Sequence, residues 1–515
     1  MTRPRRLSAG RVSRNLPGVN RLVPALILLA GCAEPGRSFP NGFQWGIATA
    51  AHQSEGRNVH SDWQVFEDLG RAPKAGLAQN SWELYDEDAA SAQSVGLNAF
   101  QFGIEWARVV PRRPADPFGE LTAADLDADA VAHYHQVLAS LRARGLTPIV
   151  AVTHFSLPAW VCNPRAWDAT AKVFTDSLGC WTSADTGRAL GRWAEFLAKE
   201  YGDEVQWWIT VDEPMVNVVA GYMSGDFPPG LENLSLEATN LPSGQTPIDV
   251  IRHLIDGHAR AYHAIKAVRP DAKVSIAQNS VAWEPVHGSD RAATERVHRA
   301  YNLLFLDGIT AGTFDPGLIG TGQKEQHPDW AGTADWIGVN YYDSAWVVDA
   351  PNFLLPIAAV PCSPAFKNAF PELLEALGCP DKGPREAPGL KKILLDYQQR
   401  YGLPMIITES GFIDSPEGKA EKLTELLGVL HEAIEEGADV RGYHYWSLNH
   451  TYEWNSGWTE DMGLFTFAGL SERNANGDAA LEDWAPDATT DFTRVPLKAI
   501  VEAYRGIAST NRLPP

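Results

Sequence analysis

The segment that decides the fold is residues 184–214, ADTGRALGRWAEFLAKEYGDEVQWWITVDEP. Residues 184–201 form an amphipathic helical pattern, and Gly202 follows at the position where a helix commonly ends. Residues 205–213 are a short run rich in Trp, Ile, Thr and Val, which is typical of a buried strand. The segment therefore contains one helix and one strand joined by a short turn.

The same alternation of strand and helix recurs along the rest of the chain. Short β-rich runs lie at residues 45–51, 99–106, 147–154, 205–213, 273–279, 336–342, 404–409 and 440–448. Amphipathic helical stretches lie between them, for example at 130–144, 251–268 and 419–436. Alternating strands and helices indicate a parallel sheet, and eight such units predict a closed barrel. The predicted fold class is therefore α/β: a single (β/α)8 TIM barrel with long loops at the carboxyl ends of the strands.

Composition excludes several classes of protein. The 515 residues are 44% hydrophobic and 21% charged, as in an ordinary globular protein with a sizeable core. A total of 64 acidic residues against 43 basic ones gives a net charge of −21, and like charges argue against nucleic acid as a partner. Domains of roughly 150 residues would make this about three domains, but barrels often run longer as one.

The domain division follows from the absence of any low-complexity linker within residues 39–509. We expect a signal peptide at 1–31, a short tether at 32–38, the barrel at 39–509 and a tail at 510–515. The Pro-rich stretch 351–390 breaks the alternation, so it is predicted to be a loop insertion after the sixth strand. Long loops at this end of a barrel usually shape a site.

The N-terminus has the pattern of a processing segment. All the charges of residues 1–31 are Arg, and an apolar run follows at 22–30 that is too short to span a bilayer but fits a signal peptide. It ends Leu29-Ala30-Gly31-Cys32, which resembles the lipobox of bacterial lipoproteins. We therefore expect export and lipidation at Cys32, with membrane contact only through that anchor, and Ala33 favours the outer membrane. Plain secretion with an ordinary cleavage site is the alternative.

Cysteine usage agrees with export. Four cysteines remain after Cys32, and an even number in an oxidising compartment favours disulfides. Four cysteines allow three connectivities, of which we expect the one between sequence neighbours: Cys162 with Cys180 and Cys362 with Cys379. The spacing does not resemble a zinc site.

Polar side chains gather in or just after the predicted strands, where catalytic groups converge in a (β/α)8 barrel. They are Gln53, Gln101, His154, Glu213, Asn340, Tyr342, Glu409 and Trp446. Two carboxylates stand out, because Glu213 and Glu409 each lie where an apolar strand gives way to a loop. A pair of carboxylates performs glycoside hydrolysis, although a glutamate at a strand end is also often a salt-bridge partner.

Five stretches resemble motifs of glycoside hydrolase family 1, the β-glucosidase-like retaining enzymes. Residues 210–214 (TVDEP) are similar to the acid/base motif T-x-N-E-P, and residues 407–411 (ITESG) to the nucleophile motif I-T-E-N-G. Residues 446–454 resemble the sugar-binding W-S-L…F-E-W segment, and residues 39–56 and 494–504 resemble the two ends of the family's sequence. The resemblance covers nearly all of residues 39–509.

The resemblance implies a role for each matching residue. Glu409 would be the nucleophile and Glu213 the acid/base, with their carboxyl groups about 5–5.5 Å apart. The residues that would contact the sugar are Gln53, His154, Asp212, Asn340, Tyr342, Glu453 and Trp454, with Trp446 as the aromatic platform under the ring. The Tyr342 hydroxyl would also contact the nucleophile. Each of these side chains could instead belong to the core or to a buried hydrogen-bond network.

Two positions depart from the family pattern. Gln101 stands where the family has an Arg that hydrogen-bonds the nucleophile and offsets its charge, and Asp212 stands where it has an Asn. Gln101 can still support Glu409 with a neutral hydrogen bond, but charged hydrogen bonds are roughly twice as strong. The changes remove one positive charge and can add one negative charge, so we expect at least one raised pKa and slower chemistry or a shifted pH optimum.

The sequence therefore predicts an exported β-glucosidase-like hydrolase that acts on a small glycoside or oligosaccharide by double displacement, without metal or cofactor. Glu453 would repel a sugar 6-phosphate, so a non-phosphorylated sugar is expected. Gluco-, galacto- and fucosides remain open, as do the aglycone and transglycosylation. The alternative is a glycan-binding lipoprotein on a catalytically impaired scaffold, which Gln101 and Asp212 favour and the retained carboxylate pair disfavours.

Overall fold

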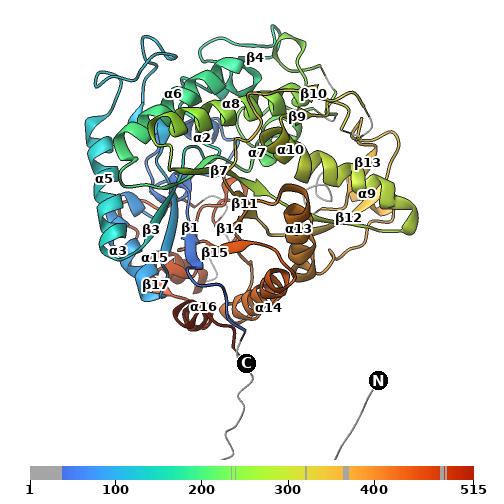
Figure 1. Cartoon of the computed structure of the whole chain (residues 1–515). Coiled ribbons are helices and arrows are strands. Elements are labelled where there is room, and N and C mark those ends of the chain that lie inside the picture. The colour runs from blue at the N-terminus through green and yellow to red at the C-terminus, as the bar shows by residue number, and fades with distance from the viewer. Residues whose placement is uncertain are drawn as a thin grey trace, which may run out of the picture.

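The computed structural model describes residues 37–514, except 234, 238, 319, 321, 364–370, 476–480, 482 and 483. At its centre is a closed barrel of parallel strands in the order β1-β15-β14-β11-β7-β6-β3-β2 (Figure 1). The strands are β1 (Gln44–Ala48), β2 (Ala99–Gly103), β3 (Thr147–Ala151), β6 (Trp207–Asp212), β7 (Lys273–Asn279), β11 (Ile337–Asn340), β14 (Met405–Glu409) and β15 (Val440–Trp446). Each lies within or next to a predicted run, and the predicted (β/α)8 barrel is confirmed.

Helices surround the barrel on its outside (Figure 1). They include α5 (Ala128–Ala143), α6 (Ala184–Tyr201), α8 (Pro247–Val268), α14 (Pro416–Glu435) and α16 (Lys498–Thr510). Side-chain caps fix where several begin, because the first helical N–H groups have no partner within the helix. The Asp127 side chain accepts from the amide of Ala130 at the start of α5, and Ser183 accepts from Asp185 at the start of α6.

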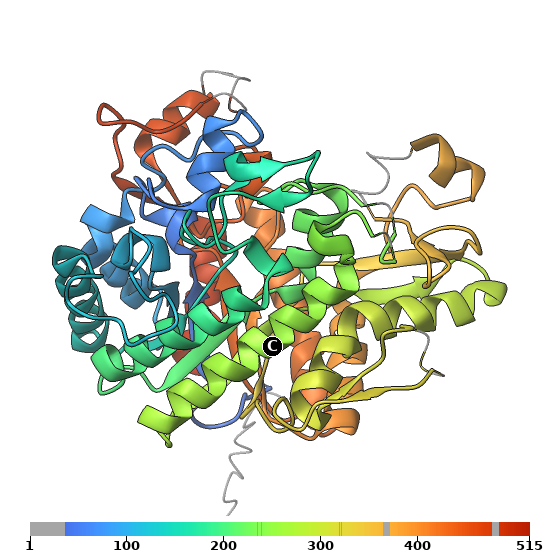
Figure 2. The ribbon, with the colours of Figure 1, turned by 90° about the horizontal axis from the view of Figure 1, so that it is seen from above.

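The insertion predicted at 351–390 is more ordered than a loop. Strands β8 (Ala282–Pro285), β12 (Ser344–Asp349) and β13 (Ala359–Pro361) form a small separate sheet, and α12 (Pro371–Ala376) follows. This part, yellow to light orange in Figure 2, projects from one side of the barrel. The insertion also ends earlier than predicted, because α13 (Glu386–Tyr401) begins inside it and accommodates Pro388 in its first turn, where no N–H donor is needed.

Both predicted disulfides are present in the structure, Cys162–Cys180 and Cys362–Cys379. The first cross-links the loop between β3 and α6, and the second cross-links the parts of the insertion on either side of α12. The sequence-local connectivity is therefore confirmed.

The ends of the described chain meet at the amino-terminal end of the barrel. Ser38 forms a β-bridge with Arg512, and the amide of Phe39 donates to the carbonyl of Asn511 at 3.0 Å. The predicted tail at 510–515 is therefore tied to the start of the barrel over these residues. The signal peptide and Cys32 lie outside the described residues. Within the described ranges, no helix has both the length and the apolar character needed to cross a membrane.

Candidate active site

A cavity of about 420 Å³ lies at the carboxyl ends of the barrel strands. Most of the predicted site residues line it, namely His154, Glu213, Tyr342, Glu409, Trp446, Glu453 and Trp454. The others are fully buried: Gln53, Gln101 and Asn340 donate to Glu453, Glu409 and Glu213 of that lining, and Asp212 accepts from Asn340. The structure thus brings all the residues predicted from the strand ends into one cluster.

Glu213 lies between β6 and α7 (Pro214–Val219) in the left-handed backbone region, with φ 43° and ψ 62°. For a residue other than glycine this conformation costs roughly 1 kcal/mol or more and is characteristic of functional sites. Its amide donates to the carbonyl of Ala277 on β7 at 2.8 Å. Its Oε1 accepts from Nδ2 of Asn279 at 3.0 Å and Nδ2 of Asn340 at 2.9 Å. Neighbouring strands therefore fix the carboxyl group through one oxygen.

Glu409 is the last residue of β14 and is 3% exposed. Its Oε2 accepts from the Tyr342 hydroxyl at 2.9 Å, as predicted, and its Oε1 accepts a long hydrogen bond of 3.4 Å from Nε2 of Gln101. The turn after it needs a glycine, because a Cβ on Gly411 would lie 2.1 Å from the carbonyl oxygen of Trp446. The Glu-Ser-Gly sequence therefore lets the end of β14 pass directly beside β15.

A third carboxylate, Asp212, lies in the same cluster and is fully buried. Its Oδ1 accepts from Nδ2 of Asn340 at 3.4 Å, the same amide that contacts Glu213. Its Oδ2 lies 3.5 Å from Nδ1 of His154, and that nitrogen is 4.0 Å from Oε1 of Glu409. Neither Asp212 Oδ2 nor His154 Nδ1 has a hydrogen-bond partner among the described residues.

Burial raises the pKa of all three carboxyl groups. The pKa of Glu409 lies well above its usual value because of burial and the neighbouring Asp212 and Glu213. Burial and Glu213 likewise raise the pKa of Asp212, and burial raises that of Glu213 against hydrogen bonds from Asn279 and Asn340. Within the described part of the chain, no Lys or Arg forms an ion pair with these three groups. The cluster therefore holds protons to higher pH than isolated carboxyls do.

A second group of the residues predicted to contact a sugar gathers around Glu453. Oε1 of Glu453 accepts from the indole N–H of Trp446 at 2.9 Å, and its Oε2 accepts from Nε2 of Gln53 at 3.3 Å. Burial raises the pKa of Glu453 to about 8. The rings of Trp446 and Trp454 each lie nearly parallel to that of His154, with centroids 5.7 Å and 6.1 Å away. These rings and polar groups form the mixed surface that suits a sugar.

Asn279 is a site residue that was not predicted from the sequence. Asn279 ends β7, and its amide donates to Glu213 while its Oδ1 accepts from the Tyr301 hydroxyl at 2.9 Å. The same signal that identified the other residues, a polar side chain at a strand end, was present in its sequence.

His444 was also missed, and no sequence pattern marks it. It lies in the middle of β15, fully buried, with Nδ1 3.3 Å from Oε1 of Gln101. If that nitrogen carries the proton, it donates to the Gln101 carbonyl oxygen and orients the amide N–H toward Glu409. Gly46 makes room for the ring, because a Cβ there would lie 2.2 Å from Cδ2 of His444.

A larger, mostly apolar cavity of about 680 Å³ opens beside the first. The two share Val216, Asn279, Asp343 and Glu386 as lining residues. Its apolar walls come mainly from α7, α8, β8 and the insertion, and include Met215, Val219, Met223, Ile251, Val281, Trp283, Leu354 and Ile357. It therefore lies next to Glu213, on the side where Asn279 holds that carboxyl group.

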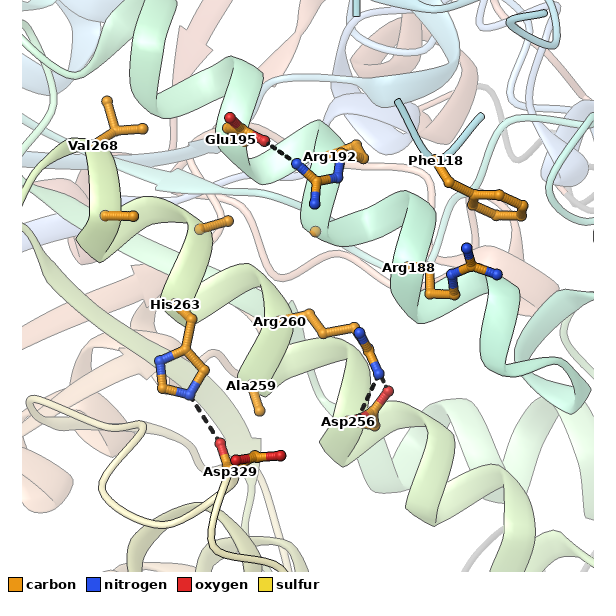
Figure 3. Close-up of a pocket in the computed structure, with 13 residues that line it drawn as sticks. Phe118, Arg188, Arg192, Glu195, Asp256, Ala259, Arg260, His263, Val268 and Asp329 are labelled. Carbon is orange, nitrogen blue, oxygen red and sulfur yellow. Dashed lines mark hydrogen bonds and ion pairs between the residues drawn. The ribbon is translucent and has the colours of Figure 1, made fainter. Parts of the chain in front are cut away.

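A third hollow, of about 560 Å³, lies on the outside of the barrel between α6 and α8 (Figure 3). Three arginines line it, but each is paired with a nearby carboxylate on its own helix: Arg188 with Asp185, Arg192 with Glu195 and Arg260 with Asp256. None of the predicted site residues reaches it. We therefore assign it no part in the site.

Comparison with known proteins agrees with this geometry. Residues 36–476 match the family described as Glycosyl hydrolase family 1. A β-galactosidase of Sulfolobus acidocaldarius is 30% identical over 479 residues, which cover 85% of this chain and 92% of the relative. A probable inactive β-glucosidase 14 of Oryza sativa is 27% identical over 487 residues, covering 86% and 90%. The solved β-glycosidase of Pyrococcus horikoshii superposes with a TM-score of 0.72 at 27% identity, covering 93% of this chain and 97% of that one. The chain therefore belongs to glycosyl hydrolase family 1 and is an O-glycosyl hydrolase.

Proposed function

We propose that the protein is a retaining β-glycosidase in which Glu409 is the nucleophile and Glu213 the acid/base. One observation carries the proposal: both carboxyl groups lie at the carboxyl ends of barrel strands in a single cavity, and Asn340 links Glu213 to Thr408, the residue before Glu409. The Asn340 amide donates to Glu213 at 2.9 Å, and its Oδ1 accepts from the hydroxyl of Thr408, the residue before Glu409, at 2.6 Å. The fold thus holds the two acids in one fixed arrangement.

Each step follows from the chemistry of these two groups. In the first step protonated Glu213 gives its proton to the glycosidic oxygen while Glu409 attacks the anomeric carbon, so the aglycone leaves as an alcohol and an ester forms. The ester no longer carries the charge of Glu409, which lowers the pKa of Glu213. Glu213 then takes a proton from water, the water oxygen attacks the anomeric carbon, and Glu409 leaves as carboxylate. Tyr342 stabilises that carboxylate through its hydroxyl.

The sugar we propose is uncharged. Glu213, Glu386, Glu409, Glu453 and Glu460 all line the cavity, which disfavours a phosphate group even where Glu453 holds its proton. Lys422 also lines it, but its Nζ lies 3.1 Å from a carboxylate oxygen of Asp414. The relatives named β-galactosidase and β-glucosidase support a gluco- or galactoside.

The stereochemistry of hydrolysis tests the proposal. ¹H NMR of an aryl β-glucoside or β-galactoside reaction should show the β-anomer of the free sugar before any α-anomer, because two inversions retain configuration. An α-anomer formed first would contradict the double displacement. Binding of the glycosides without hydrolysis would favour the second candidate, a glycan-binding protein, which the unbalanced charge of Asp212 and Glu409 favours.

The two departures from the family pattern should set the acid side of the pH profile. Glu409 must be ionised to attack, and its raised pKa means that it gains a proton early as pH falls. Gln101→Arg or Asp212→Asn should lower that pKa, so the acid limb of kcat/KM should move to lower pH by about one pH unit, the effect of one charged hydrogen bond. The profile is measured with an aryl β-glycoside in the presence of a chelator. Asp396→Asn is the control, because it removes an ion pair with His298 outside the cavity, and it should not move the acid limb. If the profiles of all variants superimpose, Gln101 and Asp212 do not set the pKa of Glu409.

The apolar cavity beside Glu213 predicts an apolar aglycone. Alkyl β-glycosides with primary alcohols of equal basicity should react with a kcat/KM that rises with chain length, by up to about fourfold per methylene group, because each buried methylene gains about 0.8 kcal/mol. Val219→Asp places a charge in that wall and should flatten the rise without changing the rate for the methyl glycoside. A kcat/KM that does not depend on chain length would show that the apolar cavity does not bind the aglycone.

We further propose export and lipidation at Cys32, on the strength of the Leu29-Ala30-Gly31-Cys32 sequence. The two disulfides support an oxidising compartment. Labelling with radioactive palmitate in a bacterial host should mark the protein, and Cys32→Ser should abolish the label; equal labelling of both would refute lipidation.

A further inference from the structure

We propose that the site binds a divalent transition-metal ion of the Zn²⁺ class through Asp212 Oδ2, His154 Nδ1 and Glu409 Oε1, and that this ion inhibits the enzyme. One ligand atom from each of these three buried residues lies within 4.8 Å of the other two. His154 Nδ1 is 3.5 Å from the Asp212 oxygen and 4.0 Å from the Glu409 oxygen. Imidazole nitrogen and carboxylate oxygen are the ligands of many catalytic zinc sites.

Unsatisfied polar atoms point into the centre of this group. Asp212 is 0% exposed and His154 is 6% exposed, yet Asp212 Oδ2 and His154 Nδ1 have no hydrogen-bond partner among the described residues. A buried polar atom without a partner destabilises the folded protein, and an ion bound to both atoms would remove that cost. The arrangement therefore has two of its ligand atoms free in the folded protein.

The other oxygens of the two carboxylates hold them in position. Asp212 Oδ1 accepts from the Asn340 amide, and Glu409 Oε2 accepts from the Tyr342 hydroxyl. Each carboxylate thus turns its remaining oxygen toward His154. Hydrogen bonds of this kind orient metal ligands and strengthen binding.

Two of the three ligand separations already suit a small ion. Ligands about 2.1 Å from a tetrahedral ion are about 3.4 Å apart, and trans ligands of an octahedral ion are about 4.2 Å apart. The His154–Asp212 separation of 3.5 Å already matches the first value, and the separation of 4.0 Å from His154 to Glu409 lies between the two. The third pair, Asp212 and Glu409, is separated by at most 4.8 Å. These two side chains must therefore approach each other by up to about 1.4 Å to reach the tetrahedral spacing.

Charge explains why this chain, and not a relative with the family pattern, would bind the ion. Asp212 supplies an anionic ligand where the family pattern has a neutral Asn. Gln101, 3.4 Å from Oε1 of Glu409, leaves uncompensated the negative charge that an Arg would balance. A divalent cation at the centre supplies the missing positive charge. The same two departures that the glycosidase mechanism leaves unexplained thus define the metal site.

Occupation of the site would stop hydrolysis. An ion on Glu409 Oε1 withdraws the electron pair that attacks the anomeric carbon, and it fills the space between His154 and Asp212 that the resemblance assigns to sugar hydroxyls. We expect inhibition that competes with the glycoside and that a chelator reverses.

Metal binding is tested directly, independently of hydrolysis. Isothermal titration of the purified, chelator-treated protein with Zn²⁺ should show one site per chain, and Co²⁺ should give a visible ligand-field spectrum. Asp212→Asn removes a ligand and Gln101→Arg adds a competing cation, so each should weaken the site by at least about tenfold. Asp396→Asn, which changes a His–Asp pair outside the cavity, should leave it intact.

The outcomes separate the metal site from the proposed function. Loss of the Zn²⁺ site and of the Co²⁺ spectrum in both variants, with retention in Asp396→Asn, supports the proposal even if no glycoside is hydrolysed. Absence of binding in the unaltered protein, or equal binding in all four proteins, overturns it. Circular dichroism of each variant shows that a lost site is not a lost fold.

Discussion

Replacing Glu409 with glycine is expected to lower kcat on aryl β-glycosides by roughly 10⁴-fold or more, since the variant lacks the carboxylate that forms the glycosyl ester. The cavity left by the side chain admits a small anion in place of the carboxylate. Sodium azide should then restore part of the rate and give an α-glycosyl azide, because a single inversion replaces two. Kinetics with and without azide, and NMR of the product, measure both effects.

A matched control separates chemistry from folding. Glu425→Gly changes an exposed glutamate within α14, where glycine costs about 1 kcal/mol of helix stability. This variant therefore lowers the stability of the fold without changing a residue of the cavity. It should keep the full rate and show no response to azide. If Glu409→Gly keeps the full rate, or if azide does not raise the rate of this variant, Glu409 is not the nucleophile.

The fold could be predicted because the barrel repeats one pattern eight times. Each strand is a short apolar run whose side chains are buried on both faces, as in β14, where every residue is buried. Burial of this kind leaves a signal in composition that does not depend on distant contacts. The insertion carries no such repeat, and its sheet depends on β8 meeting β12, which lie about sixty residues apart.

The site could be predicted as a set of residues but not as a set of contacts. Strand ends of a barrel converge, so Glu213, Asn340 and Glu409 were certain to approach one another once the eight strands were identified. The contact between Gln101 and His444 depends on side-chain direction within two strands, and on the space beside Gly46. The side-chain directions and the space beside Gly46 depend on how the strands pack, which a single sequence does not display.

The raised carboxyl pKa values could also be predicted only in part from the sequence. The sequence predicts that losing an Arg and gaining an Asp raises at least one carboxyl pKa, and the structure gives raised values for Asp212, Glu213 and Glu409. Burial is the largest cause of each rise, whereas the sequence displays only the change in charge. Desolvation was not visible in the sequence because the degree of burial follows from how the loops close over the strand ends.

Replacing Glu213 with glutamine is expected to slow hydrolysis in a way that depends on the leaving group. Glutamine keeps the shape of the side chain and can still contact Asn279 or Asn340, but it cannot donate a proton to the glycosidic oxygen. For alkyl β-glycosides, whose alcohols need that proton, kcat/KM should fall by about 10²–10⁴-fold. For a dinitrophenyl β-glycoside, whose phenolate leaves unaided, the first step should be nearly unaffected.

The same variant should change the alkaline side of the pH profile. Burial raises the pKa of Glu213, so the unaltered enzyme holds the proton, and its first step, up to a higher pH than a solvent-exposed glutamate would allow. Activity should fall as pH rises through that value. In Glu213→Gln the limb should disappear for the dinitrophenyl substrate, because no proton remains to be lost. Equal losses for both leaving groups, or an unchanged alkaline limb, would mean that the proton comes from another residue, for example Asp212 in the same cluster.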